Sequence, residues 1–161
     1  MINLDPVTTV MAFLLFGAFS VPFIANHRKN KKKAASLLQS LHSKAQELGA
    51  QLDQTETWRY LYGLGLDSSR KHLAYTGPDF QSTLIDLKEV KKVQPIRRTR
   101  EIDSNGQKRS VLDEIYLEVS FTTQGKKPLL LEIYNQEQFS DLQGETLIAD
   151  RWADLIQKLL H

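Results

Sequence analysis

Three acidic residues, Asp113, Glu114 and Glu118, are the only carboxylates near a predicted strand whose types and spacing could serve acid–base chemistry. Such chemistry needs two ionisable groups within hydrogen-bond reach of one substrate. Successive residues of a strand point to opposite faces, so Asp113 and Glu114 diverge, and no histidine has a sequence reason to lie near them. We interpret the group as polar surface and predict that the chain is not an enzyme.

Other reactive patterns are incomplete in the sequence. The four histidines are too scattered for a zinc-ligand motif, and there is no cysteine. The segment Gly63–Gly65 begins like a dinucleotide-binding loop, but it lacks the third glycine and the helix that must follow. Serine hydrolase chemistry would need a G-x-S-x-G elbow, which is missing. The sequence therefore predicts no metal, no cofactor and no catalytic residue, and the glycines are expected to let a strand bend or approach a neighbour closely.

A basic region extends from Lys88 to Arg109, with eight Lys and Arg residues against three Asp and Glu residues, a net charge of +5. On a domain beside a membrane, this region could face anionic lipid or an acidic partner. The alternative is a solvated strand edge whose Lys and Arg side chains block edge pairing. The candidate partner or lipid contacts are Lys91, Lys92, Arg97, Arg98 and Arg100.

An uncharged run of nineteen residues, Val7–Ala25, precedes a second basic cluster. As a helix it would be about 28 Å long, close to the ~30 Å hydrocarbon core of a bilayer. A buried core helix would show a polar face, and a cleaved signal peptide would carry its positive charge before the apolar run. Here the charge follows the run, at Arg28, Lys29, Lys31, Lys32 and Lys33.

This order predicts a single-pass anchor of the inner membrane, with the N-terminus outside and the C-terminal domain in the cytoplasm. The basic cluster is expected to contact the membrane surface. The net charge of +2 hides an asymmetry, because residues 27–50 carry +5 and residues 51–161 carry −2. A nucleic-acid binder would place its positive charge on the folded domain, so no nucleic-acid partner is expected.

After the cluster, apolar residues recur with heptad spacing and predict a helical stalk. They are Ala34, Leu38, Leu41, Ala45, Leu48 and Leu52. The seam is expected to pack on its own domain or on a partner, and a homodimer through the stalk is the alternative. We therefore divide the chain into an anchor (1–26), a basic juxtamembrane segment with the stalk (27–54), and a folded domain (55–161).

From Thr57 the hydrophobic period changes to two, which is typical of strands. Residues 58–67 are predicted as one strand with five residues on its inner face: Trp58, Tyr60, Tyr62, Leu64 and Leu66. Further strands are expected within 72–77, 82–87, 88–101, 115–123 and 128–135, and the turn Asn105–Gly106 within a polar loop. A closing helix is predicted with Thr146 as its N-cap. Its apolar stripe is Ile148, Trp152, Leu155, Ile156 and Leu159.

This order of elements resembles the pleckstrin-homology-like superfold, particularly its bacterial membrane-anchored members. YGLGLDSSRKHLAYTG looks like the first hairpin, STLIDLKEVKKV resembles a strand with the short turn before the fourth strand, and ADRWADLIQKLL is similar to the closing helix with its tryptophan. The resemblance implies an α+β domain in which a half-open antiparallel β-barrel is capped by the C-terminal amphipathic helix. It also implies seven strands where six are counted, the seventh lying around Gln138–Leu142 or arising from a split at Pro95.

These features predict a non-catalytic adaptor or accessory subunit that presents its domain for protein–protein contact, with a membrane protein as the expected partner. The anchor would confine the domain to a thin layer and raise its effective concentration for other membrane proteins. The alternative is a domain that senses anionic lipid at the membrane surface.

Overall fold

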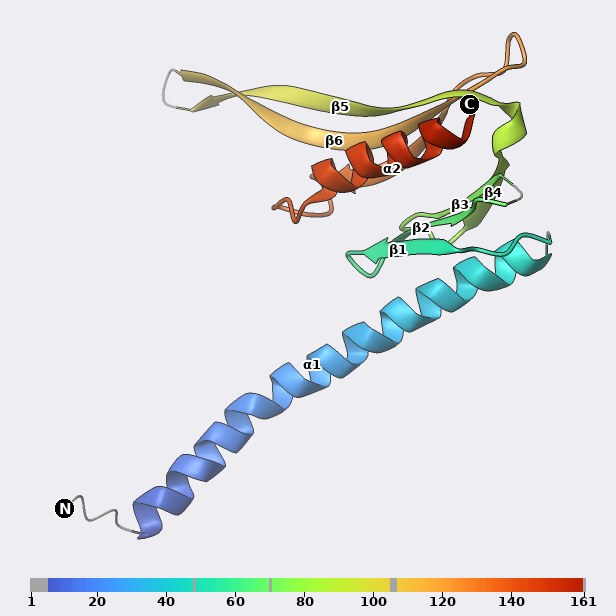
Figure 1. Ribbon diagram of the computed structural model, residues 1–161. Helices are drawn as coiled ribbons and strands as arrows, with labels where there is room; N and C mark the ends of the chain where they lie inside the picture. The colour runs from blue at the N-terminus through green and yellow to red at the C-terminus, as the bar shows by residue number, and fades with distance from the viewer. Residues whose placement is uncertain (1–5, 48, 70, 105–106, 161) are drawn as a thin grey trace. The chain divides into compact units, whose positions relative to one another are not determined.

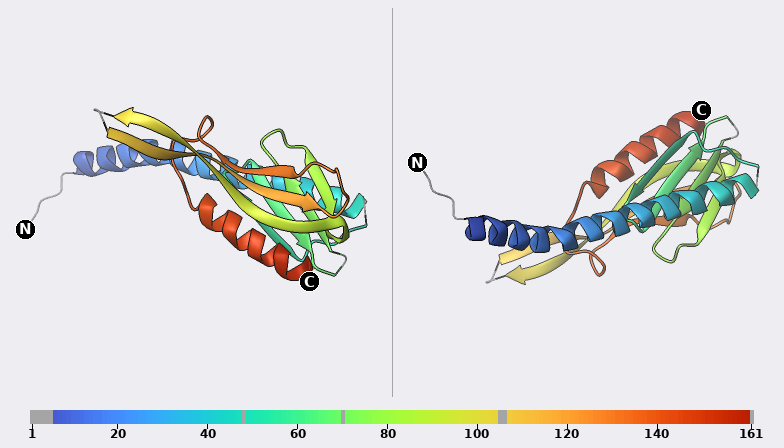
Figure 2. Two further views of the ribbon diagram at one scale, coloured as in Figure 1. Left: turned by 90° about the horizontal axis from the view of Figure 1, so that it is seen from above. Right: turned by 90° about the horizontal axis from the view of Figure 1, so that it is seen from below.

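The protein is a mixed α+β chain with a long N-terminal helix, two antiparallel sheets and a C-terminal helix (Figures 1 and 2). The computed structural model describes residues 6–47, 49–69, 71–104 and 107–160. It forms two compact units, one up to Ser36 and one from Leu37 onward. The elements are α1 (Pro6–Glu47), β1 (Gln54–Trp58), β2 (Tyr62–Asp67), β3 (His72–Thr76), β4 (Ser82–Asp86), the 3₁₀ helix η1 (Leu87–Glu89), β5 (Val90–Ser104), β6 (Gln107–Phe121), β7 (Leu129–Asn135) and α2 (Glu145–Leu160).

The strands form a four-stranded sheet in the order β1-β2-β3-β4 and a three-stranded sheet in the order β5-β6-β7. Neither sheet closes into a barrel within the described residues, so the predicted half-open barrel is corrected to two separate sheets. The helix η1 separates β4 from β5. Side chains of the first sheet bond to backbone carbonyls of β7, since the Trp58 indole donates to Ile133 O at 2.9 Å and the Tyr75 hydroxyl to Glu132 O at 2.8 Å.

The single strand predicted over residues 58–67 is wrong, because a tight turn divides it into the end of β1 and all of β2. Trp58 pairs with Tyr62 across this turn, and both Arg59 and Tyr60 have positive φ angles. Tyr60 therefore leaves the inward face on which the alternation placed it. The seventh strand arises from this division, and β5 runs without a break through Pro95, which an edge strand tolerates.

The closing helix buries the predicted apolar stripe against both sheets. Trp152 and Ile156 are buried, and Ile148, Leu155 and Leu159 are partly buried against the same core. The helix begins at Glu145, so the prediction that Thr146 is its N-cap is wrong. The Trp152 indole donates to Glu56 Oε2 at 2.6 Å, which links α2 to β1.

The last turns of α1 pack on the four-stranded sheet, as the seam predicted. Leu41 and Ala45 of the predicted seam are buried, and Leu48 lies outside the described residues. The seam is wrong by one residue at Leu38, which is only half-buried, because the neighbouring Leu37 is the side chain that faces the sheet's core and is buried. The approach is close at the glycines of β2, since a Cβ atom built on Gly65 would lie 2.6 Å from a methyl carbon of Leu41. This packing confirms the interpretation that the glycines allow a neighbour to come near.

Strands β5 and β6 continue beyond β7 as a two-stranded ribbon (Figure 1). Strand β7 pairs with β6 only from Glu114 to Val119, so residues 99–104 pair with residues 107–112 alone. The predicted turn at Asn105–Gly106 lies outside the described residues.

The first unit consists of the N-terminal part of α1. In the part of the chain that the structure describes, no helix combines the length and the hydropathy required to cross a membrane. Residues 7–9, 12, 13, 23 and 24 of the predicted span have side chains outside that part. Seven described large apolar side chains of this unit are exposed: Val10, Met11, Leu14, Leu15, Phe16, Phe19 and Val21.

Candidate functional site

Three turns meet at one end of the four-stranded sheet, and we call residues 59–61, 77–81 and 136–144 the three-turn surface. The turn at 59–61 joins β1 to β2, and the turn at 77–81 joins β3 to β4. Gly63 pairs with Thr76, so both turns lie at the same sheet end, about 10 Å apart by the strand spacing. The segment 136–144, which leads from β7 to α2, lies beside the first turn because Arg59 binds Asp141.

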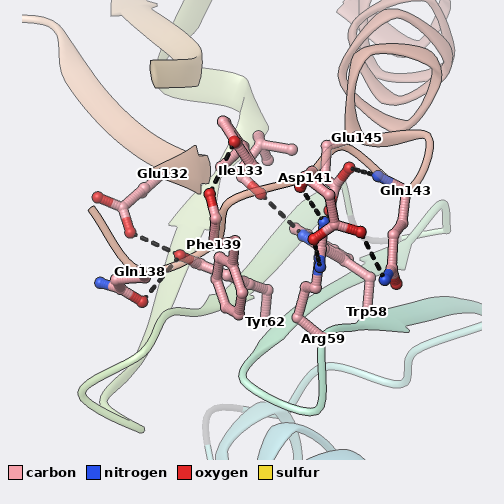
Figure 3. A network of polar contacts seen from close by, with 11 residues as sticks. Trp58, Arg59, Tyr62, Glu132, Ile133, Gln138, Phe139, Asp141, Gln143 and Glu145 are labelled. Carbon is pink, nitrogen blue, oxygen red and sulfur yellow. Dashed lines mark hydrogen bonds and ion pairs between the residues drawn. The ribbon is translucent and has the colours of Figure 1, made fainter. Parts of the chain in front are cut away.

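A buried arginine ties this surface together (Figure 3). The Arg59 side chain is only 8% exposed, and its Nε lies 2.5 Å from Oε1 of Glu145, which is 1% exposed. Its Nη1 and Nη2 donate to the side chain and backbone of Asp141 at 3.1 and 2.5 Å. The guanidinium also stacks on Phe139, with its carbon 4.6 Å from the ring centre. The guanidinium therefore fixes the first turn to the segment before α2.

The ionisation of these groups follows from their surroundings. Burial lowers the pKa of Arg59, but hydrogen bonds to Glu145 and Asp141 outweigh it, so the net pKa is raised. Hydrogen bonds from Gln143 and Arg59 lower the pKa of Asp141. Arg59 and Asp141 are thus held in their charged forms, which suits a structural tie.

A second set of contacts lies next to the arginine, centred on Tyr62 (Figure 3). The Tyr62 hydroxyl donates to Glu132 Oε1 at 2.7 Å, and its ring stacks on Trp58 with centroids 5.4 Å apart. Burial, and then the bond to Glu132, raise the pKa of Tyr62. A phenol with a raised pKa is a poor base near neutral pH. These contacts therefore support the turn and offer no reactive group.

Three large hydrophobic side chains of the three-turn surface are exposed to solvent. Tyr60 is 42% exposed, Phe80 54% and Leu142 46%. Tyr60 and Phe80 both have a φ of 57°, in the left-handed region that non-glycine residues avoid. Such a conformation costs about 1–3 kcal/mol per residue and persists where the surrounding structure enforces it. Two strained residues thus project aromatic rings into solvent at one sheet end.

The turn that carries Phe80 is itself well defined. Phe80 N donates to Gly77 O at 3.0 Å, and Gln81 N donates to Asp79 Oδ1 at 3.2 Å. A Cβ on Gly77 would lie 2.8 Å from the Tyr75 hydroxyl oxygen, so the turn comes close to its own strand. The Phe80 ring is therefore presented from a turn held by one backbone–backbone hydrogen bond and one hydrogen bond to the Asp79 carboxylate.

The basic residues predicted as partner or lipid contacts lie exposed on β5, but carboxylates of other elements neutralise several of them. Arg97 pairs with Asp150 of α2 at 2.5 Å. Arg98 pairs with Glu114 at 3.1 Å, and Arg100 with Asp113 at 3.4 Å. Lys91 and Lys92 are exposed near the start of the strand. Folding brings Asp150, Glu114 and Asp113 beside the strand, which lowers the net positive charge that the sequence count assigned to it.

The basic cluster Arg28, Lys29, Lys31, Lys32 and Lys33 lies on α1, and all five residues are exposed. These residues belong to the first unit, whereas the three-turn surface belongs to the second. The cluster stays a predicted membrane-surface contact.

Among the residues that the structure describes, no group of three or more His, Asp or Glu residues lies close enough to hold a metal ion. Sequence reasoning missed Tyr60 and Phe80, because the first was assigned to a strand and the second to a connection. The Gly77-Pro78-Asp79 turn sequence before Phe80 is a signal that could have singled it out.

Comparisons of the chain with protein-family models, with curated proteins and with solved structures found no match.

Proposed function

We propose that the protein is a non-catalytic, membrane-anchored adaptor or accessory subunit whose C-terminal domain makes a protein–protein contact through the three-turn surface. The observation that carries this proposal is the exposure of two aromatic rings, Tyr60 and Phe80, on residues with strained backbone conformations. Aromatic residues are enriched among the side chains that dominate binding energy at interfaces. Rigid presentation favours binding because less conformational freedom is lost on association.

The anchor is supported by the sequence and by the exposed helix. The run Val7–Ala25 has no charged residue, and its described large apolar side chains are exposed on α1. A basic cluster follows the run, as on the cytoplasmic side of a single-pass inner-membrane protein. In this proposal residues 28–33 contact lipid headgroups, and the N-terminus lies outside.

A pleckstrin-homology-like fold is the architecture we propose for the second unit. Two observations support it: sheets of four and three strands in sequence order, and a closing helix that buries Trp152. The corner between β1 and β7 is bridged by the Trp58 indole, so the sheets act as one core.

Lipid sensing through β5 is the less supported alternative. Its three arginines, Arg97, Arg98 and Arg100, each have a carboxylate partner within 3.4 Å. A paired arginine must exchange its partner for a headgroup, which reduces the gain in electrostatic energy. The stalk homodimer is likewise less supported, since Leu41 is already buried within its own unit.

The test of the proposed function is purification of the full chain from its native membrane in mild detergent, with identification of the co-purifying proteins. We expect a membrane protein in stoichiometric amount. A variant carrying Tyr60→Gly and Phe80→Gly should lose it, whereas Arg97→Gln with Arg98→Gln should retain it. Recovery of the chain alone, with bound anionic lipid, would overturn the adaptor function.

A further inference from the structure

We propose that the three-turn surface recognises a basic, apolar peptide segment, of the kind that flanks the cytoplasmic end of a transmembrane helix in another membrane protein. This inference rests on the proposed function and adds the chemistry of the partner. The charges that surround the exposed rings support it.

The charge of the three-turn surface is one-sided. Residues 59–61, 77–81 and 136–144 contain three carboxylates, Asp79, Glu137 and Asp141, all exposed. The only cation in these ranges is Arg59, whose side chain is 8% exposed and lies between Glu145 and Asp141. The formal charge of the three segments is therefore −2, and their exposed charge is wholly negative.

The negative charges lie close to the apolar groups. Asp79 directly precedes Phe80, and Asp141 directly precedes Leu142. The charges of Glu132 and Asp79 reach the Tyr75 hydroxyl, whose pKa is raised by its burial and then by these carboxylates. A partner that covers the rings must therefore place its own side chains beside carboxylates. Lysine and arginine near apolar anchors satisfy both requirements.

The cytoplasmic face of the membrane, where we propose that the domain lies, contains such basic and apolar segments. Loops on the cytoplasmic side of membrane proteins are enriched in lysine and arginine next to apolar transmembrane segments. An anchored domain meets these segments at raised effective concentration. An anionic lipid surface is a poorer occupant, because its charge has the same sign as that of Asp79, Glu137 and Asp141.

The test uses the full chain in detergent and three fluorescent peptides of 14 residues, measured by anisotropy. The first contains five lysines and four leucines among serines. The second has glutamate in place of lysine, and the third has serine in place of leucine. We expect only the first to bind, with an affinity that falls with salt. Asp79→Asn with Glu137→Gln should weaken this binding at least threefold.

Glycine variants separate binding from folding. Tyr60→Gly and Phe80→Gly remove the rings and relieve the positive φ, so the melting temperature should rise while peptide binding falls at least tenfold. Lys71→Gly is the matched control, since Lys71 has a φ of 55° in the β2–β3 turn at the other end of the sheet. It should raise the melting temperature and leave binding unchanged.

Equal binding of the glutamate peptide would overturn the inference, and so would lysine-peptide binding that survives the Tyr60 and Phe80 variants. Preferential binding of phosphatidylserine vesicles through the same rings would also overturn it. Preferential binding of a peptide copied from residues 23–38 would make a second copy of this chain the occupant and would likewise overturn it. The native pull-down distinguishes this failure from that of the proposed function. A partner that is lost with the double glycine variant, while the lysine peptide binds no better than the glutamate peptide, removes this inference and leaves the proposed function standing. A partner recovered equally with wild type and the double glycine variant removes both this inference and the assignment of the adaptor contact to the three-turn surface. Absence of any partner removes the adaptor function itself.

Discussion

Arg59 of the three-turn surface and Glu145 at the start of α2 form a deeply buried ion pair, and this burial decides what each substitution does. Glu145→Ala would leave the guanidinium with Asp141 alone, at a cost of about 3 kcal/mol in the free energy of unfolding. Asp141 is 59% exposed, so Asp141→Ala should lower the free energy of unfolding much less than Glu145→Ala, because solvent screens an exposed charge. Urea denaturation of the full chain in detergent, followed by tryptophan fluorescence, measures both. Equal costs would show that the buried pair has no special role.

Three tyrosines with raised pKa values predict a loss of stability in alkali. Burial and then the Glu114 carboxylate raise the pKa of Tyr116 to about 12, whereas a tyrosine of the unfolded chain titrates near about 10. Between these two pH values the folded state keeps a proton that the unfolded state releases. The contribution of Tyr116 to the free energy of unfolding is therefore complete below about pH 10 and is lost as the pH rises toward 12. Tyr62 and Tyr75, whose pKa values are also raised, act in the same direction.

Melting temperatures recorded between pH 9 and pH 12 test this effect. Tyr116→Phe should reduce the fall of the melting temperature across that range, because the group that releases the proton is removed. The control is Ser120→Ala, which removes a hydroxyl from the same strand. Identical slopes for wild type and Tyr116→Phe would contradict the assignment.

Two glycines of β2 face the end of α1, and the space for an added Cβ atom is smaller at Gly65 than at Gly63. Alanine variants at these two positions can therefore be compared directly. A Cβ on Gly65 would lie 2.6 Å from both Leu41 and Leu52, whereas one on Gly63 would lie 3.3 Å from Leu41. Gly65→Ala should therefore cost about 1–3 kcal/mol by overpacking, and Gly63→Ala less. Hydrogen exchange of residues 37–47 should accelerate in the first variant. Equal exchange in both would mean that the helix does not depend on this approach.

Much of the second unit could be predicted from sequence, because alternating apolar residues mark buried strands and a 3.6-residue stripe marks α2. The turn at Arg59 and Tyr60 could not, since neither residue is a typical turn former and the alternation continues through them. Its conformation is enforced by Glu145 and Asp141, which are more than eighty residues away in the chain. The pairing of Arg97 with Asp150 could not be predicted either, because the two residues are far apart in the sequence.

At the scale of the whole molecule, the proposed topology can be tested with little interference because the chain has no cysteine. Asn3→Cys should react with a membrane-impermeant maleimide on intact cells, and Gln124→Cys, in the exposed β6–β7 connection, only after lysis. Gln124→Ser, which adds no thiol, is the background control. The reverse pattern would contradict the orientation, and release of the chain by alkaline carbonate would contradict the anchor itself.

Trp58 and Trp152 are the only tryptophans of the chain, and each donates its indole N–H across a different junction. Trp58 joins the two sheets, and Trp152 joins α2 to β1. Both rings are buried in one cluster, so their emission is expected to be blue-shifted in the folded protein. Replacing one at a time with phenylalanine would yield two optical reporters, one for separation of the sheets and one for departure of the helix. The fluorescence of these two tryptophans can therefore show which junction opens first when a partner binds or when the protein begins to unfold.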